Sequence, residues 1–412
     1  MEKFLTLKSV DQILQLIQQF APLDTEDISL EDSFGRILAE PFLAPQDLPG
    51  FTRSSMDGYA VRAKDMFGAS ENMPALFDCI GECHMGETPA LVIGPGQTAR
   101  IWTGGMLPPG ADAVVMLEYA RAAGKNQIEL TRPVAPLDHV ITADEDAAKG
   151  ATLLTAGSRL RPQELGLLAA FGVHSISVYK KPRVAIISSG DEVVAISATP
   201  EPGQVRDINS YTLDALVRAC GAESRRLGIS GDKPTELLAL VNTTIDWADV
   251  VLVSGGSSAG QRDCTAQVFE ALGAKILAHG VAISPGKPLI LARKNQKSFW
   301  GLPGHVASAL VCAEVFIRPL LYQLSGRQVE AAWQSGHKAV LTRSVASAQG
   351  RRDYIRVRVR DNAQSGALPL ATPLMGKAGL ITTLVEADAL IICPEDNEGL
   401  SAGQIVELHE LL

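Results

Sequence analysis

Short apolar runs and helical segments alternate along the chain from Lys181 onward, and this alternation restricts the possible folds more than any other feature. Strands are predicted at 184–187, 223–229 and 249–253, and helices at 209–221, 234–242 and 263–272. Asp263 is well placed as the N-cap of the last helix, and Gly273 as its stop. Strands that alternate with helices of about ten residues are typical of a mostly parallel, doubly wound α/β sheet.

The carboxyl ends of the predicted strands are the place to look for a ligand site. In doubly wound sheets, ligands bind in the loops beyond these ends. The loops of interest therefore follow Ile187, Ile229, Val253, Ile283 and Trp300. Glycine, serine or charged residues occupy each of them, so the sequence predicts a polar site at this edge.

The loop after Val253 begins with Ser254, Gly255, Gly256 and Ser257 and leads into the helix that Asp263 caps. Glycines allow the backbone to approach a ligand closely, and free N–H groups at a helix N-terminus suit a phosphate or another oxyanion. A plain Gly/Ser connection explains the same residues. The pattern differs from the GxGxxG dinucleotide fingerprint, which disfavours an ordinary nicotinamide enzyme.

A second candidate for anion binding is the segment Ser284-Pro285-Gly286-Lys287-Pro288, which follows the predicted strand around Val281. The ammonium of Lys287 is suited to a phosphate. The segment resembles a P-loop only superficially, because the glycine spacing is wrong and Pro288 stands where the magnesium-binding hydroxyl belongs. A nucleotide-triphosphatase function is therefore rejected.

Acidic residues are expected along the same edge of the sheet. Asp191 and Glu192 follow one strand, Asp232 follows the next, and Asp263 lies near the Gly/Ser loop. Adjacent carboxylates bind Mg²⁺ while phosphate oxygens complete its coordination shell. A capping role for Asp191 is the competing interpretation. Several acids around an anion site imply a cation.

The flanking segments predict further domains. An amphipathic helix is expected from Ser9 to Phe20, with Ser9 and Gln12 in capping-box positions, and a second helix from Arg161 to Phe171. Gly and Pro turns with short β-like runs predict a β-rich insertion, and alternation at Tyr354–Arg360 predicts a C-terminal sheet with its arginines on the solvated face. The expected domains are a discontinuous N-terminal, helical/extended dimerisation domain (1–45 and 147–178), the β-rich insertion (46–146), the α/β domain (179–324) and the C-terminal β domain (325–412).

Composition narrows the class of protein. The 412 residues carry a net charge of −9, which argues against a nucleic-acid-binding or membrane-binding surface. No uninterrupted apolar run reaches the roughly 18 residues of a membrane span, and the N-terminus does not resemble a signal peptide. The six cysteines form no CxxC pair, so a cytoplasmic location is expected, and a zinc site at Cys79, Cys83 and His84 is disfavoured.

Taken together, an ordered set of short motifs resembles the molybdopterin molybdenumtransferase family, which includes the C-terminal domain of gephyrin. Taken alone, the motifs of the β-rich segment are better explained by simple turns than by ligand contact. The set covers nearly the whole chain and comprises Ser55–Ala60, Thr103–Val115, Glu145-Asp146, Gly190–Glu192, Ser254–Gly256, Asp263, Pro285–Pro288 and Gly301-Leu302-Pro303-Gly304.

The resemblance implies four domains, a homodimer, and a reaction in which molybdate enters adenylylated molybdopterin and AMP is released with the help of Mg²⁺. It also implies contact with an upstream molybdopterin adenylyltransferase and with recipient molybdoenzymes. By motif, the catalytic residues would be Asp57, Thr103, Asp146, Glu192, Asp232, Asp263 and Lys287. The pterin-binding residues would be Ser254, Gly255, Gly256, Ser257, Pro285, Gly286, Lys287, Pro303 and Gly304, and the metal ligands Asp191, Glu192 and Asp232.

The chain departs from the family pattern at four places. Ser284 stands where lysine is usual, Asp144 where glycine is usual, and Ala378 where serine is usual, while His305-Val306 replaces Asn-Pro. The first two changes weaken anion binding electrostatically. A non-catalytic paralogue that binds the pterin as carrier or sensor, and a tungstate-inserting homologue, are therefore the alternatives. For His305 we expect a packing or loop hydrogen-bonding role rather than pterin contact.

Overall fold

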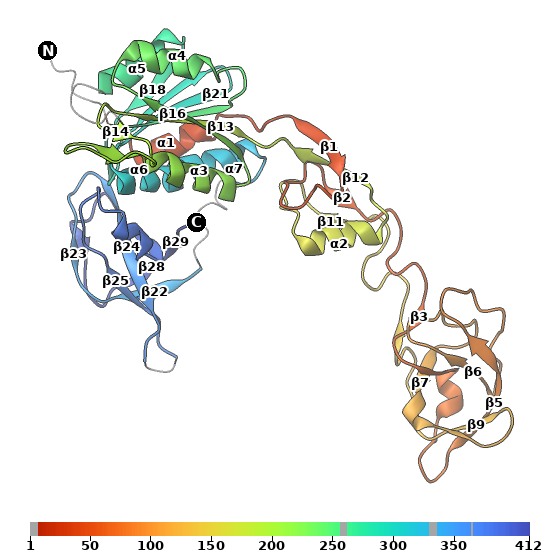
Figure 1. The fold of residues 1–412 in the computed structure, drawn as a ribbon. Helices are drawn as coiled ribbons and strands as arrows, with labels where there is room; N and C mark the ends of the chain where they lie inside the picture. The colour runs from red at the N-terminus through yellow and green to blue at the C-terminus, as the bar shows by residue number, and fades with distance from the viewer. Residues whose placement is uncertain (1–6, 256–261, 329–335, 364–365) are drawn as a thin grey trace. The chain divides into compact units, whose positions relative to one another are not determined.

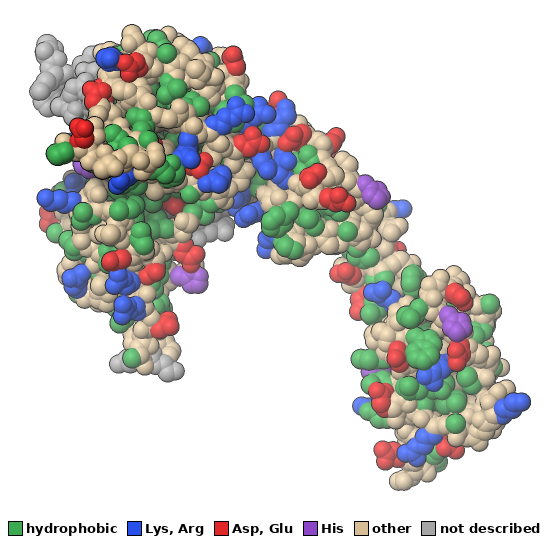
Figure 2. Space-filling model, in the orientation of Figure 1, with side chains coloured by type: hydrophobic (Ala, Val, Ile, Leu, Met, Phe, Trp, Pro, Cys, Tyr) green, Lys and Arg blue, Asp and Glu red, His purple; other side chains and the backbone are tan. Residues whose placement is uncertain are grey.

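The computed structural model describes residues 7–255, 262–328, 336–363 and 366–412, without the side chains of 262 and 263. The chain divides into two compact units (Figure 1). Unit 1 comprises 1–40, 156–165 and 174–412, and unit 2 comprises 41–155 and 166–173. On the face seen in Figure 2, acidic and basic side chains are interspersed on both units.

Unit 1 is built around a six-stranded sheet. Its order is β16 (Glu223–Ser230), β13 (Arg183–Ser189), β17 (Val250–Gly255), β21 (Lys297–Leu302), β20 (Ile290–Lys294) and β18 (Lys275–His279). The first four strands are parallel, and β20 and β18 complete the sheet with antiparallel pairings. The predicted mostly parallel α/β sheet is confirmed.

Both faces of this sheet are buried because neighbouring residues of a strand point to opposite sides. In β13, Val184 and Ile186 join one apolar cluster, while Ala185 and Ile187 join the other. The helices covering the two faces appear on opposite sides of the sheet in Figure 1. They are α1 (Val10–Ile17), α3 (Asn209–Ala219), α6 (Val306–Cys312) and α7 (Arg318–Leu324) on one face, and α4 (Pro234–Asn242) and α5 (Arg262–Ala271) on the other.

Helices α6 and α7 are joined by a π-helical turn, Ala313–Ile317, into one apolar helix. Residues 306–324 are apolar and long enough to cross a membrane, but 83% of that stretch is buried inside the structure. Its length and composition therefore reflect a central position in the core, where Phe316 stacks on Trp300 of β21.

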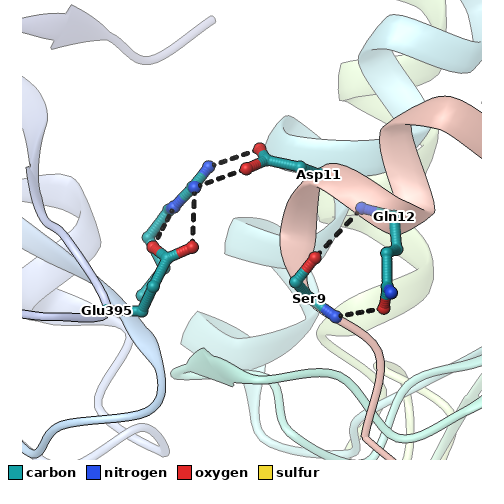
Figure 3. A network of polar contacts seen from close by, with 5 residues as sticks. Ser9, Asp11, Gln12 and Glu395 are labelled. Atoms are coloured by element: carbon teal, nitrogen blue, oxygen red, sulfur yellow. Dashed lines mark hydrogen bonds and ion pairs between the residues drawn. The ribbon is translucent and has the colours of Figure 1, made fainter.

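The capping box at the start of α1 is confirmed. The Ser9 hydroxyl accepts a hydrogen bond from Gln12 N at 3.2 Å, and the Gln12 side chain accepts one from Ser9 N at 2.9 Å (Figure 3). Helix α1 ends at Ile17, three residues before the predicted end at Phe20. The rest of the predicted N-terminal domain (1–45 and 147–178) contains more strand than the sequence predicts. In unit 1, β1 (Thr25–Ser29) pairs with β12 (Ser175–Tyr179).

Unit 2 carries the predicted β-rich insertion, which is confirmed. Its sheet runs β7 (Ala113–Met116), β4 (Gly58–Val61), β6 (Gln97–Ile101), β5 (Ala75–Cys83), β9 (Gln127–Leu130) and β8 (Ala120–Ala122). Tyr59, Phe77 and Val115 lie in its core. Two short antiparallel pairs form separate two-stranded sheets, β3 (Arg53–Ser54) with β10 (Val140–Ile141) and β2 (Phe42–Leu43) with β11 (Thr152–Leu154). Helix α2 (Pro162–Ala170) spans the boundary between the units, as the chain passes from one to the other.

The C-terminal segment forms a second sheet in unit 1. The order is β28 (Ile405–Glu407), β22 (Lys338–Leu341), β25 (Leu370–Pro373), β24 (Arg352–Arg360), β26 (Ala389–Cys393) and β29 (His409–Glu410), and the short β23 (Val345–Ala346) and β27 (Gly399–Leu400) pair separately. The prediction that the arginines of β24 lie on a solvated face is wrong for Arg356, which is 7% exposed. Its guanidinium donates to Thr383 Oγ1 at 2.7 Å and to Gly376 O at 2.9 Å, and these partners allow it to be buried. The domain boundaries given above stay a prediction.

Candidate functional site

A cavity of about 540 Å³ lies at the carboxyl edge of the parallel strands in unit 1. Strands β13, β17 and β21 end at this cavity with Ser188-Ser189, Ser254-Gly255 and, just past β21, Gly304. The remaining lining residues are Glu192, Val193, Val205, Arg206, Asp207, Ile208, Asn209, His305, Val306 and Gly379. Most of them follow β13 or precede α3, where β14 (Val193–Val194) pairs with β15 (Val205–Arg206). The predicted loops after Ile187 and Val253 therefore do meet.

Asp207 organises the floor of the cavity. It is 8% exposed, and its carboxylate accepts hydrogen bonds from Ser188 Oγ at 2.7 Å, Ser210 N at 3.1 Å and Ser210 Oγ at 2.6 Å. The bonds from Ser210 satisfy groups in the first turn of α3. Because all three donors converge on one buried carboxylate, the end of β13 and the start of α3 are held at a fixed distance.

Asn209 connects the other two strand ends. Its Nδ2 donates to Ser254 Oγ at 2.7 Å and to Gly304 O at 2.8 Å. The Ser254 hydroxyl in turn donates to Pro303 O at 3.4 Å. The side chains of Ser254 and the backbone of Pro303 and Gly304, all predicted to bind pterin, are thereby brought together.

Close packing explains the glycine at position 255. Its φ is +124°, and a Cβ added there would lie 1.8 Å from the carbonyl oxygen of Ser189 on the neighbouring strand. Glycine is therefore required both by the positive φ and by the lack of space for a Cβ. The next predicted residues, Gly256 and Ser257, lie outside the described residues, as does the side chain of Asp263.

The acids predicted as metal ligands lie beside the cavity. Asp232 N donates to Asp191 Oδ1 at 3.0 Å, and Asp191 N donates to Asp232 Oδ2 at 3.4 Å, while Glu192 lines the cavity itself. Burial raises the pKa of Asp232; the hydrogen bond from Asp191 N lowers it, and the negative charges of Asp191 and Glu192 raise it further. Accumulated negative charge of this kind is relieved by a bound cation.

This arrangement fits Mg²⁺ only in part. Within the described residues, no group of three or more His, Cys, Asp or Glu side chains is arranged to hold a metal ion. Mg²⁺ often uses one or two protein carboxylates and takes its other ligands from water and substrate phosphates. Asp191 and Asp232 satisfy that smaller requirement.

The segment with Lys287 is placed differently from the prediction. The strand assigned around Val281 is wrong, because the strand of the central sheet, β18, ends at His279, and β19 (Ile283–Ser284) instead pairs with β24 of the C-terminal sheet. Since β18 runs in the same direction as β21, the loop still begins at the carboxyl edge. Lys287 is exposed, and Gly286 packs so closely that an added Cβ would lie 2.4 Å from Cys312 Sγ. Neither Pro285, Gly286 nor Lys287 lines the cavity.

Unit 2 brings together two of its three predicted residues. Asp57 Oδ1 accepts hydrogen bonds from Thr103 N at 2.8 Å and Thr103 Oγ1 at 2.7 Å. The backbone bond and then the side-chain bond lower the pKa of Asp57, so an exposed carboxylate is kept ionised. Asp146 lies on a separate turn, where its N–H donates to Leu48 O at 3.0 Å.

Sequence reasoning missed Asp207, Asn209, Arg206 and Gly379. A signal was present for Asp207, since an aspartate just before a predicted helix is a capping candidate. No periodic pattern marks the two-residue strands β14 and β15 that carry Arg206, or the C-terminal segment that carries Gly379. For His305, the expected packing or loop hydrogen-bonding role stays a prediction; its side chain is exposed and lines the cavity.

Comparisons with known proteins agree along nearly the whole chain. Family models described as "MoeA N-terminal region (domain I and II)", "Probable molybdopterin binding domain" and "MoeA C-terminal region (domain IV)" match residues 8–172, 185–323 and 338–411. The molybdopterin molybdenumtransferase of Bacillus subtilis is 35% identical over 97% of this chain and 93% of its own length. That of a Nostoc species is 35% identical over 94% of this chain and 89% of its own length.

Solved structures support the same relationship. A molybdopterin biosynthesis MoeA protein of Pyrococcus horikoshii is 35% identical, with a TM-score of 0.82 over 99% of this chain and all of the other. A second structure of that name and organism is 27% identical, with a TM-score of 0.79 over 98% of this chain. With its fold, its strand-end site and these relatives in agreement, the chain belongs to the MoeA family of molybdopterin molybdenumtransferases.

Proposed function

We propose that the chain is a molybdopterin molybdenumtransferase, an enzyme that inserts molybdenum from molybdate into adenylylated molybdopterin with release of AMP. The observation that carries the proposal is the cavity at the carboxyl ends of β13, β17 and β21. Serine hydroxyls, an amide and glycine backbone line it, and carboxylates stand at its rim. A phosphate-bearing ligand and a divalent cation are what such a site is suited to bind.

Each group has a role in this proposal. The backbone around Gly255 and Gly304 receives the pterin phosphate, and the hydroxyls of Ser188 and Ser254, bonded to Asp207 and Pro303, hold the strand ends that carry this backbone. Asp191, Glu192 and Asp232 hold Mg²⁺, which when bound would neutralise phosphate charge, and Lys287 and Asp263 are further candidates from the sequence. In unit 2, Asp57, Thr103 and Asp146 orient molybdate or water by hydrogen bonding.

The same proposal covers the location, oligomeric state, partners and domains of the chain. The chain acts in the cytoplasm as a homodimer, receives its substrate from a molybdopterin adenylyltransferase and supplies molybdoenzymes. The domains 1–45 with 147–178, 46–146, 179–324 and 325–412 are proposed as its structural divisions. Support for the homodimer and the partners comes from family resemblance, and the gaps between the three family matches support the divisions near 179 and 325.

The deciding experiment supplies the purified chain with adenylylated molybdopterin, Mg²⁺ and either molybdate or tungstate. AMP release and retention of the pterin are followed in the same reaction. We expect AMP release that requires both the oxyanion and Mg²⁺, and the ratio of the two oxyanion rates gives the preference. Stoichiometric pterin binding without oxyanion-dependent AMP release would contradict the enzyme and point to a carrier.

A further inference from the structure

His305 occupies an unusual position on the cavity wall. It lies between the end of β21 and the start of α6, where the chain turns from the sheet into the core helix. Its side chain is exposed and lines the cavity. A histidine that served only to pack the loop would be covered by neighbouring side chains, and this one faces open space.

The backbone on both sides of His305 is fixed. Gly304 O accepts from Asn209 Nδ2 at 2.8 Å, His305 O accepts from Ala309 N at 2.9 Å, and Ala307 N donates to Ala378 O at 2.9 Å. The imidazole, by contrast, makes no capping bond to α6 and has no hydrogen bond or ion pair within the described part of the chain. A rigid backbone with an uncommitted polar side chain is preorganised for a ligand.

The imidazole lies beside Gly379, which follows β25 in the C-terminal segment and also lines the cavity. A Cβ added to Gly379 would lie 3.4 Å from His305 Cδ2, an ordinary van der Waals distance. The segment carrying Gly379 is held by the bonds of Arg356 and by packing of Leu384 on Val306 and Ala307. The ring therefore lies against a surface that has no side chain and is firmly anchored.

Charge identifies what the imidazole can bind. Two of the lining side chains, Glu192 and Asp207, are acidic. Arg206 directs its Nε to Ile196 O and Ala198 O, both at 3.1 Å. Arg206 and His305 are the two basic side chains among the described lining residues; Arg206 is held by these two bonds, whereas His305 has no hydrogen bond or ion pair there. A phosphate brought beside these carboxylates needs a compensating N–H donor.

We propose that His305 is a specificity-determining residue that donates a hydrogen bond to a phosphate oxygen of the substrate at the cavity mouth. The proposal rests on the proposed function for the identity of the substrate. The phosphate is either the adenylyl phosphate or the terminal phosphate of the pterin, which share the same chemistry. A histidine contact would be a feature of this chain, because the family usually has asparagine at this position.

The test compares the full-length wild type with His305→Ala, His305→Gln and, as a matched control, His174→Ala, which alters another exposed histidine. Calorimetric titration measures affinity for AMP and for adenosine, which lacks the phosphate. Steady-state kinetics give KM and kcat for adenylylated molybdopterin. The thermal midpoint of each variant checks folding.

Loss of a charge-assisted hydrogen bond predicts about tenfold weaker AMP binding for His305→Ala. Adenosine affinity and the thermal midpoint should stay unchanged, and His305→Gln, which keeps an N–H donor, should recover part of the loss. An unchanged AMP affinity with a KM for the full substrate raised about tenfold would assign the contact to the pterin phosphate instead.

Unchanged AMP affinity together with unchanged KM in His305→Ala overturns the proposal while leaving the enzyme function intact. Conversely, the wild type could release no AMP and yet bind AMP more tightly than adenosine. If His305→Ala then loses this preference, the proposed function is refuted and the phosphate contact is kept. If the wild type neither binds AMP nor turns over, both proposals fail.

Discussion

The structure favours the ionised form of Asp57. Two hydrogen bonds from Thr103 lower the pKa of its exposed carboxyl, so it remains charged at neutral pH. Asp57→Asn keeps the shape and one acceptor oxygen but removes the charge. If this carboxylate orients the oxyanion or water, AMP release should fall by roughly 10²-fold or more, the range observed when a positioned acid or base is lost.

The control for Asp57 is Asp138→Asn. Asp138 is also an exposed aspartate of unit 2 that accepts a backbone hydrogen bond, from Ala135 N at 2.8 Å, but it belongs to no predicted site. Its variant should retain the wild-type rate, and both variants should keep the wild-type thermal midpoint. Equal rates for Asp57→Asn and wild type would remove Asp57 from the site.

The pKa of Asp232 is shifted in the opposite direction to that of Asp57. Its pKa is raised in the folded chain, by burial first and also by the charges of Asp191 and Glu192. The folded state then binds the proton more tightly than the unfolded state, so ionised Asp232 opposes folding at neutral pH; this cost shrinks as the pH falls through the folded pKa and is gone below the unfolded pKa. Asp232→Asn should raise the thermal midpoint at pH 7 by roughly 1–3 °C, with a smaller difference in acid.

Magnesium distinguishes a binding role for Asp232 from mere crowding of charge. Because a cation that binds only the folded chain stabilises it, Mg²⁺ should raise the midpoint of the wild type more than that of Asp232→Asn. Differential scanning fluorimetry with and without Mg²⁺ measures both effects. A variant that melts below the wild type in the absence of Mg²⁺ at pH 7 would show that the carboxylate is stabilising, contrary to this account.

At the scale of elements, the approach of β13 to β17 depends on Gly255. A Cβ there would lie 1.8 Å from Ser189 O, whereas Gly228, at a comparable φ of +106° in β16, has open space around its Cβ position. Gly255→Ala should therefore cost more than Gly228→Ala, by about 1–3 kcal/mol for the displaced strand. Urea denaturation of the two variants measures the difference, and equal losses would mean that backbone strain alone requires the glycine.

The elements predicted well are those with a strong periodic pattern. The predicted strand 184–187 lies within β13, the predicted strand 249–253 overlaps β17 at all but its first residue, and the predicted helix 234–242 has the bounds of α4. The half-polar β18 and the two-residue strands gave no such signal. Burial of Arg356 was missed because its partners, Thr383 and Gly376, lie 27 and 20 residues away.

The residues of the candidate site were likewise predicted where a local sequence pattern marks them and missed where it does not. Ser254, Gly255 and Gly304 follow predictable strands, so they were predicted from the sequence, whereas Gly379 was not. Asp207 and Asn209 act through partners 19 to 95 residues away, Ser188, Ser254 and Gly304, and pairings at such separations are determined by tertiary structure. Local patterns thus predicted where the site lies but not the bonds that shape it.

At the scale of the whole molecule, the start and the end of unit 1 are tied by one side chain. Arg352 of β24 donates to both carboxylate oxygens of Asp11 in α1, each at 2.9 Å, and to Glu395 at 3.0 and 3.1 Å. Figure 3 shows Asp11 and Glu395 approaching the shared group from two sides. Arg352 side-chain exposure is only 20%, so these bonds are shielded more than those of a surface pair.

Removing this contact should loosen the C-terminal sheet from α1. Arg352→Ala leaves two carboxylates, 58% and 39% exposed, without their shared cation; because both can be hydrated, we expect a loss of about 1–2 kcal/mol in the free energy of unfolding. Arg352→Lys keeps the charge but not the planar guanidinium, so its free energy of unfolding should lie between those of the wild type and Arg352→Ala. Arg358→Ala, which removes a single pair with Glu386 at 36% and 51% exposure, should cost less than about 1 kcal/mol. Urea unfolding followed by tryptophan fluorescence measures all three. Equal effects of Arg352→Ala and Arg358→Ala would mean that the contact is an ordinary surface pair, and that other bonds hold the C-terminal sheet on the α/β core.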